Sequence, residues 1–153
     1  MEPHSYNVNL SWKTSRIGEI SSPELDQAIA VATPPEFPKG VAGIWSPEHL
    51  YTAAVSSCFM TTFLAIAENS NLDFSGLTCP ASGKLEKVEG KLAMTQVLLE
   101  PVLTVPREED MDKAEKILWK AEKACLISNS ITASVHMNPR ILVSEPEAVE
   151  LTE

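Results

Sequence analysis

The sequence predicts an α+β protein in which mainly antiparallel sheet is wrapped around a long buried central helix and joined by a second, amphipathic helix. Residues 50–67 contain no Asp, Glu, Lys or Arg, which is typical of a helix covered on most sides. Residues 108–124 repeat apolar side chains at helical spacing and carry acidic and Lys residues on the other face. Residues 6–12 alternate apolar and polar side chains, the period of a half-buried strand.

Along the sequence, one group of strands is expected before the long helix and another after it. Residues 6–12 form the first, and the stretch from residue 20 to residue 31 suggests two more short strands. Residues 34–45, rich in proline and glycine, are expected to form an ordered loop. Residues 77–88 and 92–105 look like two long strands joined near Glu89-Gly90, a pair that favours a hairpin turn. A last strand is predicted over residues 131–137.

The long helix has a clear starting signal at Ser46-Pro47-Glu48. These residues supply a hydroxyl N-cap, a proline at the first helical position and an acidic residue in the first turn, and the helix should run to about Asn69. Its length approaches that of a membrane span, but Ser and Thr dilute its hydrophobicity and Glu48 and Glu68 flank it. We therefore expect a helix inside a soluble protein. Because a short chain can hardly cover so apolar a helix, we also expect a homodimer.

Composition narrows the class of protein and of partner. The chain has 153 residues, of which 44% are hydrophobic and 22% charged, which predicts a single domain over residues 1–153 with a loose acidic tail over 145–153. A net charge of -9 and a pI of about 4.8 oppose binding to nucleic acid or to an anionic membrane. The first ten residues lack the pattern of a signal peptide, so a cytoplasmic location is expected.

Three widely spaced cysteines are expected to be reduced thiols. Cys58 falls in the middle of the apolar helix and Cys125 at the end of the amphipathic one. Taken singly, each is more often a small core residue than a nucleophile. Cys79 precedes Pro80 in a predicted strand, where a structural role is favoured. The three histidines share no close spacing with one another or with the cysteines, so neither a metal site nor a bound cofactor is expected.

Taken together, the motifs resemble those of a known family. The segment from Glu48-His49-Leu50 to Cys58-Phe59, preceded by Ser46-Pro47, resembles the Asn-Pro-Glu-x-Leu and Cys-Phe pattern of the OsmC/Ohr family of hydroperoxide reductases. Cys125 with Ser128-Asn129 is similar to its Cys-Pro-x-Ser motif, and Arg16 with Gly18 to its Gly-Gly-Arg-x-Gly hairpin. The departures, which indicate a divergent branch, are Ser46 for Asn, Trp45 for a small residue, Leu126 for Pro and Thr14-Ser15 for the two glycines.

The resemblance implies an intertwined homodimer and a peroxiredoxin-like enzyme that reduces organic hydroperoxides. Cys58 would attack the peroxide as a thiolate and become a sulfenic acid, and Cys125 would close a disulfide onto it. A dithiol on a lipoyl protein or a thioredoxin-like protein would then reduce the disulfide. The resemblance also implies that Arg16 is held over Cys58 by a pairing with Glu48, because a guanidinium lowers the pKa of a neighbouring thiol.

Helix geometry limits how Glu48 can act. About 15 Å of helix separates Glu48 from Cys58, too far for both side chains of one chain to serve a single site directly. Either the long Arg16 side chain spans the gap, or Glu48 comes from the partner chain, which would also account for the dimer. An apolar approach to Cys58, lined by Phe37, Trp45 and Phe59, would favour organic hydroperoxides over hydrogen peroxide.

Two other functions use the same residues. A redox-sensing protein would oxidise the Cys58 and Cys125 pair without rapid turnover. A ligand-binding protein of the same fold would keep the cysteines as relics, and would form no disulfide between them.

Overall fold

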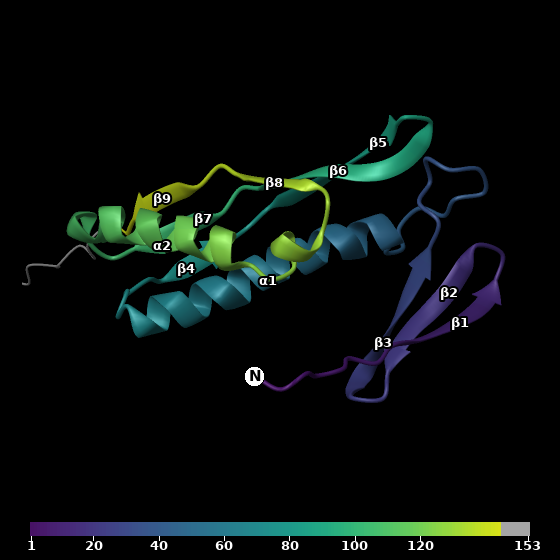
Figure 1. Ribbon diagram of the computed structural model, residues 1–153, viewed down its shortest axis with the longest axis horizontal. Coiled ribbons are helices and arrows are strands. Elements are labelled where there is room, and N and C mark those ends of the chain that lie inside the picture. The colour runs from purple at the N-terminus through teal and green to yellow at the C-terminus, as the bar shows by residue number, and fades with distance from the viewer. Residues whose placement is uncertain (145–153) are drawn as a thin grey trace, which may run out of the picture. The chain divides into compact units, whose positions relative to one another are not determined.

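The computed structural model describes residues 1–144, and the acidic tail predicted over 145–153 lies outside the described residues. Contacts divide the chain into two compact units, Met1–Leu50 and the part that begins at Tyr51. Figure 1 shows the elements of each unit in order along the chain. The long helix α1 (Pro47–Asn69) begins at the end of the first unit and supplies most of its length to the second.

The first unit is a three-stranded antiparallel meander of β1 (Asn9–Thr14), β2 (Ile17–Ser22) and β3 (Leu25–Ala32). The turn between β1 and β2 contains Ser15, whose φ of 49° lies in the left-handed region. Large apolar side chains of this unit remain exposed, among them Leu10, Trp12 and Leu25. An isolated sheet with exposed apolar groups is only marginally stable, so we expect another protein surface to bury these groups.

The second unit combines two helices with two three-stranded sheets, ordered β4-β7-β9 and β5-β6-β8. Its strands are β4 (Gly76–Thr78), β5 (Ala81–Val88), β6 (Lys91–Leu99), β7 (Val102–Val105), β8 (Ser134–Met137) and β9 (Arg140–Val143). Antiparallel pairs join β4 to β7 and β5 to β6, whereas β8 and β9 lie parallel to β6 and β7. The helix α2 (Met111–Ala124) contacts β7 and β9, beside which it runs in Figure 1.

Prolines mark the steps between these two sheets. Pro80, Pro101 and Pro139 each stand directly before a strand, and at each of them the chain passes from one sheet to the other. Because proline has no N–H to donate, it interrupts a ladder of strand hydrogen bonds. The prediction of one continuous strand over 77–88 and another over 92–105 is therefore wrong, since each stretch is divided into two strands. The strand β9 was missed by the sequence analysis.

Other sequence predictions are confirmed. The helix α1 begins at Pro47 and ends at Asn69, as the capping signal indicated. The turn between β5 and β6 is Glu89-Gly90, with φ values of 49° and 80° that suit a two-residue hairpin. The last amphipathic segment forms a short 3₁₀ helix over Glu108–Asp110 followed by α2.

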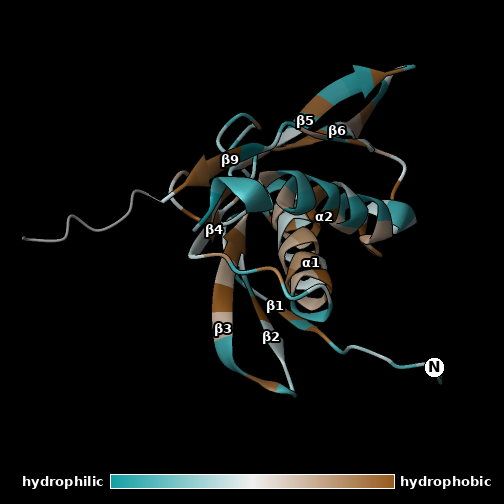
Figure 2. Ribbon diagram, turned by 90° about the vertical axis from the view of Figure 1, so that its left-hand side faces the viewer, coloured by the Kyte–Doolittle hydropathy of each residue, from teal (hydrophilic) through white to brown (hydrophobic). Residues whose placement is uncertain are grey.

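The core of the second unit gathers around one stripe of α1. Val55, Phe59, Phe63 and Ala67 recur every four residues and are fully buried, against β6, β7 and α2. Burying each Phe contributes about 1.5–3 kcal/mol. The rest of α1 stays partly open, with Met60 43% and Leu64 41% exposed, although Figure 2 colours most of this helix as apolar. By length and composition alone α1 could also cross a membrane.

Candidate active site

The two cysteines predicted to react come together in the second unit. Cys58 is half-buried on α1, next to the core residue Phe59. Cys125 is the C-cap residue of α2 and has no exposed surface. The Cys125 thiol donates a hydrogen bond to the carbonyl oxygen of Val55, with Sγ and O 4.0 Å apart, across 70 residues of sequence. Packing of α2 on α1 thus delivers Cys125 to the turn of α1 that carries Cys58.

A tight turn follows Cys125 and surrounds the two sulfur atoms. It is closed by a hydrogen bond from the Asn129 N–H to the Cys125 carbonyl (3.1 Å) and by another from the Ser130 N–H to the Ile127 carbonyl (3.0 Å). Within residues 1–144, the N–H groups of Leu126 and Ile127 donate to no backbone carbonyl. Both are therefore available to the Cys58 sulfur.

Hydrogen bonds lower the pKa of Cys58. Burial by itself raises this pKa, but the Ile127 N–H, the Thr62 hydroxyl and the Leu126 N–H donate to the sulfur. The neighbouring Cys125 side chain also lowers the pKa, and together these groups outweigh burial. The Thr62 Oγ1 lies 4.0 Å from the Cys58 Sγ. Neutral donors of the second unit alone thus favour the Cys58 thiolate, the form that attacks a peroxide.

The pKa of Cys125 moves in the opposite direction. Burial raises it, and the neighbouring Cys58 raises it further, whereas the Ser128 hydroxyl and N–H lower it without reversing the shift. Of the two thiols, Cys58 is therefore the more acidic. This difference in pKa suits a pair in which one cysteine attacks the peroxide and the other then forms a disulfide with it.

In the sequence, Ser128 stands out only as part of the motif with Cys125. The structure places it beside the Cys125 sulfur. Its Oγ atom is buried and has no hydrogen-bond partner at ordinary distance. The same hydroxyl stands where it favours a charged Cys125 sulfur. The local motif with Cys125 was the signal that could have identified it.

Arg16 and Glu48 belong to the first unit, so their action on Cys58 stays a prediction. Arg16 follows Ser15 in the turn between β1 and β2 and lines a hollow of about 290 Å³ together with Trp12 and Pro47. Glu48 is partly buried in the first turn of α1.

The three residues predicted to bind substrate have different surroundings. Phe37 is half-buried in the loop before α1, and Trp45 is 52% exposed and packs edge-on against His49, with ring centroids 6.1 Å apart. Phe59 is fully buried in the core of the second unit. Core packing accounts for Phe59 without any contact to substrate, and Phe37 and Trp45 belong to the other unit.

The start of α1 contains an interaction that the sequence analysis missed. The His49 N–H donates to the Ser46 Oγ (3.2 Å), as an N-cap requires, and the Ser46 N–H donates in return to the His49 Nδ1 (3.3 Å). This is the reciprocal arrangement of a capping box, with His in place of the usual Glu or Gln. His49 therefore caps the helix together with Ser46.

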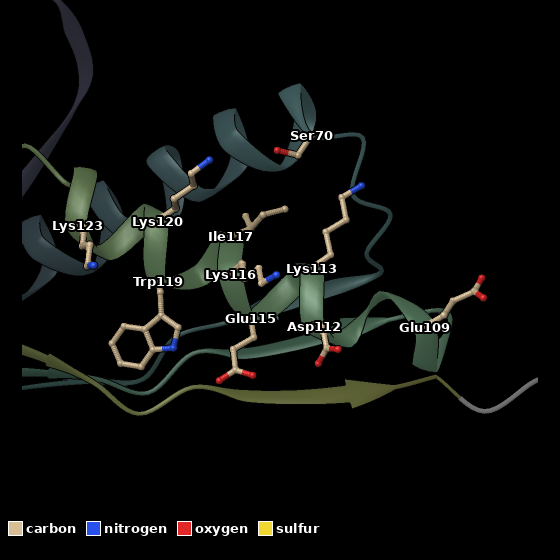
Figure 3. A pocket seen from close by; sticks show the side chains of 10 residues that line it. All are labelled: Ser70, Glu109, Asp112, Lys113, Glu115, Lys116, Ile117, Trp119, Lys120 and Lys123. Carbon is tan, nitrogen blue, oxygen red and sulfur yellow. The ribbon is translucent and has the colours of Figure 1, made fainter.

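A wide groove of about 960 Å³ lies along α2 and reaches Ser70, which follows α1, as Figure 3 shows. Lys113, Lys116, Lys120 and Lys123 line it together with carboxylates and Trp119, and none of the predicted site residues does. Across the part of the chain that the structure describes, no three His, Cys, Asp or Glu side chains are grouped so as to hold a metal ion.

Comparison with known proteins gives the same family as the motifs. The family described as OsmC-like protein matches residues 40–140. The uncharacterised protein YmaD of Bacillus subtilis is 24% identical over 142 residues, which cover 90% of this chain and 93% of that protein.

Solved structures repeat the fold. An OsmC-like protein of unknown function from Vibrio cholerae is 26% identical, with a TM-score of 0.80 over 90% of this chain and 99% of its own. A Legionella pneumophila protein, described as an organic hydroperoxide resistance protein OsmC, is 20% identical, with a TM-score of 0.73 over 94% of this chain and all of its own. On the match over residues 40–140, the chain belongs to the OsmC-like protein family.

Proposed function

We propose that this protein is a thiol-dependent peroxidase that reduces organic hydroperoxides in the cytoplasm. The observation that carries the proposal is the close approach of Cys58, whose pKa is lowered, to the buried Cys125, whose pKa is raised. Membership of the OsmC-like family supports a peroxide-related redox role, and the Legionella relative is named for organic hydroperoxide resistance.

The chemistry needs two thiols and one dithiol. The Cys58 thiolate attacks the outer oxygen of the hydroperoxide, which releases the alcohol and leaves Cys58 as a sulfenic acid. The Cys125 thiolate then attacks this sulfur, expels hydroxide, which leaves as water, and forms a disulfide. A dithiol, carried by a lipoyl protein or a thioredoxin-like protein, reduces the disulfide by two successive exchanges.

A second copy of the chain would complete the site. The face of α1 that carries Met60 and Leu64 and the apolar surface of the first unit are both left open in a single chain. A homodimer would cover them. In that dimer we propose that Arg16, oriented by Glu48, adds a positive charge beside Cys58. The sequence leaves open which chain supplies each of the two, and we further propose that both units of one chain act as a single domain.

Apolar side chains would select the substrate. Phe37 and Trp45 are the better candidates for lining the approach, because both have exposed surface. The predicted role of Phe59 requires contact at a fully buried side chain, so we assign it first to holding α1 in place.

Stopped-flow kinetics with cumene hydroperoxide test the function. We expect rapid loss of two thiols per chain and repeated turnover when a dithiol is added. Cys58→Ser should abolish turnover. Cys125→Ser should permit one fast attack and leave a sulfenic acid that a dimedone probe can trap. The variant Cys79→Ser serves as the control and should retain full activity.

The same experiment separates the other functions. Slow, stoichiometric oxidation without turnover would favour a redox sensor. If no oxidant produced a disulfide between Cys58 and Cys125, a ligand-binding role would be favoured. Full dithiol-dependent turnover in Cys125→Ser would show that Cys125 is not the resolving cysteine.

A further inference from the structure

The buried hydroxyl of Ser128, which lies beside the Cys125 sulfur, points to the direction in which the disulfide is reduced. Buried polar groups are nearly always hydrogen-bonded, and leaving one unpaired is costly. The Ser128 Oγ is buried and forms no hydrogen bond of good geometry, but it lies close enough to the Cys125 sulfur to lower the pKa of that thiol. So weak a contact at rest is explained if the sulfur becomes a strong acceptor only during the reaction.

The geometry identifies that acceptor as the sulfur of Cys125. At rest the Cys125 thiol lies 4.0 Å from the Val55 carbonyl oxygen, and its sulfur is only a weak acceptor. Once Cys125 becomes a thiolate it can only accept, and the hydroxyl and N–H of Ser128 both favour this charged form. Ser128 is therefore matched to the ionised Cys125 and not to its protonated form.

Access decides which sulfur of the disulfide is attacked. Cys125 has no exposed surface in the single chain, and assembly with other copies can only cover it further. Cys58 is half-buried and hence more accessible. The lower pKa of Cys58 would make it the better leaving group. An incoming thiolate must, however, first reach the sulfur that it attacks, so burial excludes Cys125 as the target.

We propose that the reductant attacks the Cys58 sulfur and expels Cys125, and that Ser128 is the positioning residue whose hydroxyl stabilises the departing Cys125 thiolate. This inference rests on the proposed function for the existence of the disulfide. The step is balanced: the reductant thiolate forms a mixed disulfide with Cys58, the bond between the two protein sulfurs breaks, and its electron pair stays on Cys125. The second thiol of the reductant then attacks the mixed disulfide and releases Cys58, and Cys125 takes a proton from water.

The first test locates the mixed disulfide. The full-length protein is oxidised with diamide, so that the disulfide forms whether or not the protein reduces peroxides, and is then treated with the monothiol N-acetylcysteine. After rapid quenching with an alkylating agent, mass spectrometry of the peptides should find N-acetylcysteine on Cys58 and the alkyl group on Cys125. The reverse distribution, or no disulfide even with diamide, would overturn the inference.

The second test isolates the Ser128 hydroxyl. In Ser128→Ala, reduction of the preformed disulfide by dithiothreitol should slow by about three- to tenfold, because one hydrogen bond to the leaving thiolate is lost. Ser128→Thr, which keeps a hydroxyl, should recover most of the rate. Thermal unfolding of reduced Ser128→Ala should be nearly unchanged, because only a weak contact with the Cys125 thiol is lost.

This combination distinguishes a positioning residue from a structural one. A purely structural hydroxyl would lower stability when removed and would leave the reduction rate unchanged. Ser130→Ala is the matched control, since the Ser130 hydroxyl donates to the Leu126 carbonyl (2.6 Å) and so supports the same turn. It should lower stability with a smaller effect on the rate. Equal reduction rates for Ser128→Ala and the unmodified protein would contradict the assignment.

Discussion

At the scale of single residues, Leu126 separates this chain from the Cys-Pro-x-Ser pattern that it resembles. Leu126 has a backbone N–H, which is one of the donors that lower the pKa of Cys58. A proline at this position has no N–H. The departure from the motif therefore adds a hydrogen bond to the thiolate that the usual residue could not make.

Replacing Leu126 by proline tests this donor. Cys125, the preceding residue, has φ of -64° and ψ of 111°, an extended conformation that is compatible with a following proline, so the turn should persist. We expect Leu126→Pro to raise the pKa of Cys58 and Leu126→Ala, which keeps the N–H, to leave it nearly unchanged. Ultraviolet absorbance of the thiolate, recorded against pH in a Cys79→Ser background, measures the difference. A pKa that is the same in both variants would exclude the Leu126 N–H as a donor.

The sign of the pH dependence follows from the lowered pKa of Cys58. The rate of attack on cumene hydroperoxide should be at its maximum above the pKa of Cys58 in the folded protein and fall as the pH drops through it. The contribution of Cys58 to stability has the same sign, since its lowered pKa contributes stability above the unfolded-state pKa that is lost as pH falls through the folded-state value. A pH profile of the first oxidation step, in which Leu126→Pro moves the midpoint upward, checks both the donor and the identity of the attacking thiol.

At the scale of elements, the start of α1 depends on the Ser46 and His49 pair. His49→Ala removes the acceptor for the Ser46 N–H and should lower the free energy of unfolding by about 1 kcal/mol. His49→Gln, which restores a side-chain acceptor at the same capping position, should recover most of this loss. Chemical denaturation of the three proteins measures the effect. Equal stability of all three would show that the reciprocal cap contributes nothing.

Stability also depends on close packing between β5 and α1. A Cβ atom at Gly83 would collide with the Thr52 side chain, and it would lie 2.7 Å from the end of Met94. Gly83→Ala should therefore destabilise the protein by about 1–3 kcal/mol through overpacking. Gly76→Ala is the control, because its Cβ would meet nothing nearer than the Thr104 Oγ1 at 4.0 Å. Thermal unfolding should separate the two variants clearly, and similar transition temperatures would argue against so close a contact.

At the scale of the whole molecule, the exposed face of α1 predicts the oligomeric state. Leu64→Lys places a charge on this apolar face and should convert a dimer into a monomer, as sedimentation velocity can measure. Leu92→Lys, at an exposed position near the β5–β6 turn, is the matched control and should remain dimeric. A monomeric unmodified protein would remove the basis for the dimer and for any site shared between copies.

Local chemistry in the sequence determined much of this protein. The N-cap and proline placed the start of α1, the alternation of apolar residues indicated strands, and the spacing of the motifs gave the family, because each of these signals depends on neighbours along the chain. Pro80 and Pro101, where the strands break, were visible in the sequence. The apolar residues on both sides of each proline nevertheless favoured longer strands.

Only the tertiary structure decided how the cysteines are held. The contact of Cys125 with the Val55 carbonyl joins residues 70 positions apart, and the donors to Cys58 include N–H groups of a turn on another element. No periodicity records such contacts, because a thiol's pKa depends on the burial and hydrogen bonds that packing creates around it. The sequence thus indicated the two cysteines that are predicted to react, and folding alone lowered the pKa of Cys58 and placed Ser128 beside Cys125.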